Sequence, residues 1–224
     1  MANSISIETF DEAEIITAEI WQSASSADIM LTMLLESRLF ENSNHHTPQL
    51  YLFAASCARR VTHLLQDPRS HEAIRAAELF ATNAGNSQYL LHSHLSAQSA
   101  AFDLASTYNT HPFVSTDQPN DYTQVTLFGG ALIHAAATAS MACCPTDILN
   151  PLRAAESSAR YAIKALYYEQ LSKDTDSTLI SELIEEEQHR QSHALRIFLG
   201  NPFDSKRWPP FTIPIENQVT PCTT

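Results

Sequence analysis

The side chains best suited to chemistry lie near the end of the chain, where a carboxylate and two imidazoles follow at helical spacing. Glu186, His189 and His193 are separated by three and four residues, so a helix places all three on one face. A carboxylate with two imidazoles is a known ligand set for zinc or iron. The pattern indicates a candidate metal site. The competing interpretation is a solvated face with charge pairs, such as Glu186 with Arg190.

Motifs for other common chemistries are missing from the sequence. The ferritin-like di-iron pattern requires E-x-x-H on two helices, and the sequence contains this motif once, at Glu186. The sequence also lacks the G-x-S-x-G elbow, the Walker loop, G-x-G-x-x-G and H-E-x-x-H. These absences favour a protein without enzymatic activity, and the sequence names no cofactor.

His134 stands apart because it lies in the most apolar stretch of the chain, residues 122–144. An imidazole in such a helix is expected to be a core histidine that hydrogen-bonds to a backbone or hydroxyl group. A ligand-binding or proton-transfer role is the alternative.

Three basic side chains lie off the apolar face of the predicted helix 47–66, namely Arg59, Arg60 and His63. Glu78 lies on the helix that follows and can form an ion pair with one of the arginines. A partly buried pair of this kind would fix how the two helices are set. Binding of an anion or a partner is the alternative role for these four residues.

The helix at 47–66 is the best-marked element of the sequence. Thr47 and Pro48 form a favourable N-terminus, and apolar residues then recur every three or four positions. Asp67-Pro68 ends this helix, because the residue before a proline avoids the α region, and the same dipeptide or Ser70 can open the next one. The sequence therefore predicts a helical hairpin at this position.

Similar signals predict helices along most of the chain, and four glycines with 44% hydrophobic residues favour helices over strands. The other predicted helices are 10–23, 25–40, 70–83, 87–107, 122–144, 150–172 and 176–200. The helix at 122–144 is long enough to raise the question of a membrane span. Its small residues and lack of flanking basic residues favour a buried central helix.

We therefore expect an all-α fold of about eight helices in antiparallel hairpins around a central apolar helix. One helical domain would span residues 9–200. Residues 1–8 would be frayed, residues 108–120 would form the longest internal loop, and the proline-rich residues 201–224 would form an extended tail.

The net negative charge of the chain indicates which kinds of partner it can bind. A formal charge of −12 and a pI near 5.1 argue against nucleic-acid binding, which depends on lysine and arginine. A basic protein partner suits this charge better. The four cysteines form no C-x-x-C pair, and the acidic N-terminus lacks the features of a signal peptide. These observations predict a cytoplasmic protein that is not bound to a membrane.

One segment, LFAASCARRVTHLLQDPRS at 52–70, resembles the LFACACCRRIWHLL-type segment of uncharacterised all-helical bacterial proteins common in planctomycetes. The segment LRIFLGNPF at 195–203 is similar to the LLRDIFGNPF of those proteins. The resemblance spans about residues 15 to 205. Ala58 and Thr62 depart from the usual cysteine and tryptophan. The resemblance implies a helical fold and no activity, since none is established for those proteins.

The sequence thus favours a non-enzymatic interaction or regulatory protein with an acidic surface. A helical-bundle enzyme or carrier that binds a metal or small ligand is the alternative.

Overall fold

The computed structural model describes residues 18–37, 47–108 and 124–203, and every regular element in these ranges is a helix. The prediction of an all-α fold is confirmed. After a helical segment at 18–23, the elements are α2 (Ala27–Ser37), α3 (Thr47–Arg60), the 3-10 helix η2 (Thr62–Leu64), α4 (Pro68–Ala81), α5 (Ser87–Tyr108), α6 (Gln124–Ala142), α7 (Pro151–Ser172) and α8 (Ser177–Leu199).

Capping side chains fix where the later helices begin. Asp67 caps α4, Asn150 caps α7 and Asp176 caps α8, each accepting a hydrogen bond from a first-turn amide over 2.8–2.9 Å. Proline follows the cap in α4 and α7, where its missing N–H costs nothing. Gly200 ends α8 with a φ of 67°, which glycine adopts without strain. The predicted starts of α7 and α8 agree with the structure, and of the two starts considered for α4, Asp67-Pro68 and Ser70, the structure has the first.

The predicted helix at 47–66 is shorter than expected. The α-helix α3 ends at Arg60, and η2 continues the chain after Val61, whose φ and ψ are −107° and 16°. The Thr62 hydroxyl donates to the Arg59 carbonyl over 2.7 Å, a local bond that competes with the α-helical ladder. The tighter turn moves His63 away from the direction that a continuous helix would give it.

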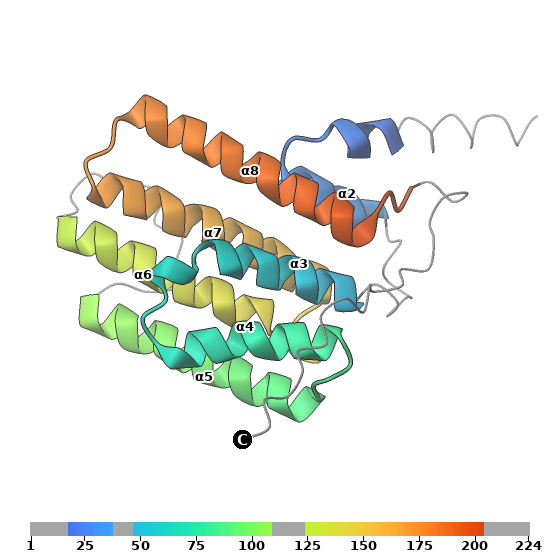
Figure 1. Ribbon diagram of the computed structural model, residues 1–224, viewed down its shortest axis with the longest axis horizontal. Helices are drawn as coiled ribbons and strands as arrows, with labels where there is room; N and C mark the ends of the chain where they lie inside the picture. Colours follow the sequence, from blue (N-terminus) through green and yellow to red (C-terminus); the bar gives the residue numbers. More distant parts are fainter. Residues whose placement is uncertain (1–17, 38–46, 109–123, 204–224) are drawn as a thin grey trace, which may run out of the picture.

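Helix α6 is the centre of the bundle, as expected. All ten residues from Ala131 to Ser140 are buried, and α6 packs against α3, α4, α5 and α7. Figure 1 shows α8 and α5 at opposite edges of the bundle, with α3, α6 and α7 between them. Helix α2 lies beside the C-terminal half of α8 (Figure 1).

By length and composition, α6 is also the one helix in the described ranges that is apolar enough to cross a membrane, with a mean hydropathy of 1.4. The surrounding helices bury 67% of this apolar stretch. The core helix of a bundle meets the same criteria, so this finding is weak evidence for a membrane span.

The helical segment at 18–23 packs against the C-terminal end of α8. Trp21 is fully buried, and its Nε1 donates to the Gly200 carbonyl over 2.8 Å. The Phe203 ring packs edge-on against Trp21 with centroids 5.7 Å apart, and Arg196 donates to the Trp21 carbonyl over 2.9 Å. The predictions for residues 1–8, for the loop up to residue 120 and for the tail beyond Phe203 lie outside the described residues.

Two adjacent glycines of α6 offer a matched test of packing. A Cβ on Gly129 would lie 2.4 Å from the Tyr108 ring, whereas a Cβ on Gly130 would lie 3.4 Å from the Tyr168 ring. We expect Gly129→Ala to lower the free energy of unfolding by about 1–3 kcal/mol, because Tyr108 must move. Gly130→Ala should instead raise it by up to about 1 kcal/mol, through helix propensity. Urea denaturation measures both, and equal effects would contradict the packing described.

Candidate functional site

Arg59 and Glu78 form an ion pair between α3 and α4. Arg59 Nε donates to Glu78 Oε1 over 2.9 Å, and Nη2 donates to Oε2 over 2.7 Å. The hydrogen bonds from Arg59 to Glu78 raise the pKa of the guanidinium. The Arg59 side chain is 50% exposed, so the pair contributes little to stability. Glu78 therefore pairs with one of the arginines, as considered from the sequence, but the pair is exposed and not partly buried.

Arg60 and Glu187 form a partly buried ion pair that joins α3 to α8, with the Arg60 side chain 32% exposed. Arg60 Nε is 2.6 Å from both carboxylate oxygens of Glu187, and the Glu187 side chain is 3% exposed. The amide Nε2 of Gln191 donates to Glu187 Oε1 over 3.1 Å and to the Ala159 carbonyl of α7 over 3.2 Å. This network fixes α8 against both α3 and α7.

This network was not predicted, because Glu187 stands in a run of three glutamates, 185–187, and such a run is typical of a solvated surface. A signal for its burial does exist in the sequence. Glu187 and Gln191 continue the spacing of the buried Ile180, Leu195 and Leu199 along α8. Polar residues on the apolar face of a helix indicate a buried pair that needs a partner from another helix.

His63 belongs to a second polar cluster, between η2 and α7. His63 Nε2 is 3.1 Å from Glu169 Oε2, and Lys173 Nζ donates to Glu169 Oε1 over 2.7 Å. Burial would raise the pKa of Glu169, but the hydrogen bonds from Lys173 and His63 outweigh it and lower this pKa. Arg59, Arg60 and His63 thus bind three different carboxylates and do not form one anion site.

His134 lies in the core between two tyrosine rings of α7. Its ring centroid is 5.7 Å from that of Tyr161 and 5.3 Å from that of Tyr168, with both pairs stacked. Nδ1 has no hydrogen-bond partner in the described part of the chain, so the expected hydrogen bond to this atom is absent there. Burial, with a contribution from Lys164, lowers the pKa of His134 to about 4. The imidazole is therefore neutral at physiological pH.

The candidate metal ligands do not assemble in the structure. Glu186 pairs with Arg190 on the surface of α8, and His189 and His193 are exposed. Within the described ranges, no group of three histidine, cysteine, aspartate or glutamate side chains is placed to hold a metal ion. For Glu186, the structure favours the solvated face over the metal site.

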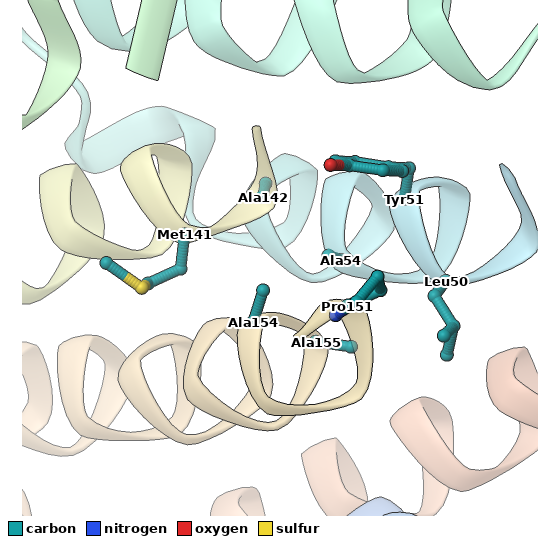
Figure 2. A pocket seen from close by; sticks show the side chains of 8 residues that line it. All are labelled: Leu50, Tyr51, Ala54, Met141, Ala142, Pro151, Ala154 and Ala155. Carbon is teal, nitrogen blue, oxygen red and sulfur yellow. The ribbon is translucent and has the colours of Figure 1, made fainter. Parts of the chain in front are cut away.

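Three thiols of the described ranges and one small void lie in the interior of the bundle. Cys57, Cys143 and Cys144 are free and buried, and burial raises the pKa of each thiol, that of Cys144 to about 11. Figure 2 shows a void where α3 meets the end of α6 and the start of α7. Its volume is about 10 Å³, the space of one water molecule. The Tyr51 hydroxyl at its edge donates to the Cys144 carbonyl over 2.7 Å.

The outer face of the first half of α8 combines exposed leucines with acidic side chains. Leu179 and Leu183 lie one helical turn apart and are 47% and 38% exposed. Between residues 174 and 189 the chain has six acidic residues and no lysine or arginine. We call Leu179, Glu182, Leu183, Glu185 and Glu186 the α8 face. Figure 1 shows α2 beside the C-terminal half of α8, away from this N-terminal half.

Comparisons of the chain with protein-family models, with curated proteins and with solved structures found no match. The resemblance to helical bacterial proteins therefore stays a prediction, and function must be argued from the arrangement of residues.

Proposed function

We propose that this protein is a non-enzymatic interaction protein and that the α8 face binds a basic protein partner. The observation that carries the proposal is the pair of exposed leucines, Leu179 and Leu183, next to a run of carboxylates without an intervening cation. Exposed apolar side chains bordered by charge are typical of protein-binding surfaces.

The rigid attachment of α8 supports the same role. Arg60, Glu187 and Gln191 fix the inner side of the helix to α3 and α7, which holds the outer side in a defined orientation. A surface that is ordered before binding loses less conformational entropy when the partner docks.

The negative charge of the α8 face favours a basic partner. Glu182 and Glu185 would meet lysine or arginine side chains, while the leucines pack against an apolar strip between them; Glu186 already pairs with Arg190. A basic amphipathic helix provides both features. Such complementarity speeds association and makes its rate sensitive to salt.

Removing the apolar part of the face should abolish most binding. We expect the double variant Leu179→Ser/Leu183→Ser to bind the partner at least about tenfold more weakly than the wild type. The matched control is Leu95→Ser, which removes an equally exposed leucine from α5 at the opposite edge. Partners are captured from cells of the source organism, and their affinities for the three proteins are measured by interferometry.

The same experiment can contradict the proposal. If the double variant binds as tightly as the wild type, or Leu95→Ser loses binding equally, the α8 face is not the interface. If the purified protein carries one metal per chain that is needed for an activity and is lost in Glu186→Ala, the alternative of a metal-dependent enzyme is favoured instead.

A further inference from the structure

The outward side of α8 has the residue spacing of a helix that pairs with another helix. Exposed side chains follow one another along it at separations of four and three positions in turn. They are Leu179, Leu183, Glu186, Arg190, His193 and Ile197. We call these six residues the α8 stripe. This spacing is the heptad pattern by which two helices pack along a common seam, and it extends over about 27 Å at 1.5 Å per residue.

Both ends of the α8 stripe are apolar and exposed. Leu179 and Leu183 are 47% and 38% exposed at one end, and Ile197 is 58% exposed at the other. Figure 1 shows α8 at one edge of the bundle, where another helix can approach it. Exposed apolar side chains that line up along one helix are typical of a surface that binds a partner.

Charge divides α8 into two parts of opposite sign. Residues 174–187 include six acidic residues and no lysine or arginine, whereas residues 188–199 include Arg190 and Arg196 and no acidic residue. At the boundary between the two parts, Glu186 pairs with Arg190, and both side chains are 52% exposed. A helix with this distribution of charge is complementary to a copy of itself that runs in the opposite direction.

An antiparallel alignment centred at the level of Gln188 brings unlike charges together. Leu179 of one copy then lies opposite Ile197 of the second copy, and Glu186 lies opposite Arg190 of the second copy. Each glutamate therefore borders two arginines, its own and that of the second copy. In a parallel alignment, Glu186 would lie opposite the same glutamate of the second copy, and the two carboxylates would repel each other.

We propose that α8 pairs with α8 of a second copy of this chain, in an antiparallel dimer with twofold symmetry. Such a dimer requires a surface that is complementary to itself, and the α8 stripe meets this requirement in its apolar ends and in its charges. The contact involves one helix from each copy, so the interface is small. We expect a weak dimer, with a dissociation constant on the order of 10 to 100 µM.

Self-pairing would regulate the α8 face, and this part of the inference rests on the proposed function. Leu179 and Leu183 belong both to the α8 face and to the α8 stripe. A second copy and the basic partner would therefore compete for them. A tightly bound partner would displace the second copy, because the dimer is weak.

The test is sedimentation velocity of the full chain at concentrations from about 1 to about 500 µM, which span the expected dissociation constant. The mass should rise from that of one chain, 24.9 kDa, toward twice this value. Glu186→Arg and Arg190→Glu should each stay monomeric, because like charges then face each other at the centre of the pair. An equimolar mixture of the two variants should dimerise, since unlike charges face each other again. Recovery in the mixture would also show that both variants fold.

The matched control is Arg75→Glu on α4. It changes the net charge by the same amount as Arg190→Glu, at a side chain that is 67% exposed, and should dimerise like the wild type. A wild type that stays monomeric at about 500 µM, or a mixture that stays monomeric, would overturn the dimer and leave the proposed function standing. If Leu179→Ser/Leu183→Ser prevents self-association but binds the basic partner as tightly as the wild type, the proposed function fails and the dimer stands.

Discussion

Replacing Arg60 by methionine is expected to lower the free energy of unfolding by about 3 kcal/mol, the usual cost of removing one partner of a buried ion pair. The reason is the environment of Glu187, whose side chain is 3% exposed and would lose both of its hydrogen bonds from Arg60 in the interior. Gln191 alone cannot replace the guanidinium, because it offers a single neutral hydrogen bond to Glu187. Urea denaturation of both proteins measures the difference.

Two companion variants separate the buried pair from general loss of charge. Arg59→Met breaks the exposed pair with Glu78 one position earlier and should cost less than about 1 kcal/mol. Arg60→Met/Glu187→Met removes both charges and should recover most of the stability. A cost for Arg60→Met no larger than that for Arg59→Met would contradict the assigned role of Glu187.

The second large effect is a loss of folding stability at acidic pH. Stability should fall by about 3 kcal/mol as the pH decreases from about 6.5 to 4, because of His134 alone. The folded protein keeps this imidazole neutral down to a pKa of about 4, whereas the unfolded chain protonates it near 6.5. Between these two values the unfolded state binds more protons, so acid favours it, and above pH 6.5 the contribution vanishes.

The variant His134→Phe isolates this contribution. Phenylalanine can stack between Tyr161 and Tyr168 and has no proton to bind. Unfolding free energies of the wild type and the variant should differ by a constant amount above pH 6.5 and diverge steadily below it. Parallel curves between pH 7 and 4 would show that His134 is solvated or paired in the folded protein.

The helices could be predicted from the sequence because their signals are local. Asp67-Pro68 and Asn150-Pro151 mark helix starts through backbone restrictions that no distant contact alters. The central position of α6 also follows from its own composition, since a helix apolar on all sides must be buried. The break after Arg60 was missed because the apolar spacing continues through it, while the Thr62 hydroxyl favours a tighter turn.

The candidate sites depend on contacts between distant residues, which spacing along one helix does not reveal. Glu186, Glu187 and His189 lie within about one turn of α8. Glu187 nevertheless faces Arg60 in the interior, whereas Glu186 pairs with Arg190 on the surface. For His134, the sequence predicted burial, but the two stacked tyrosines come from α7 and could not be inferred.

The α8 face is tested most directly by placing a photo-reactive benzoylphenylalanine at position 183 and, in a second protein, at position 95. Each protein is expressed in cells of the source organism and irradiated, and the crosslinked peptides are identified by mass spectrometry. The proposed function predicts a specific adduct from position 183, formed with a lysine- or arginine-rich segment of one protein, and none from position 95. No adduct from position 183, an adduct with an acidic segment, or the same adduct from position 95 would contradict it.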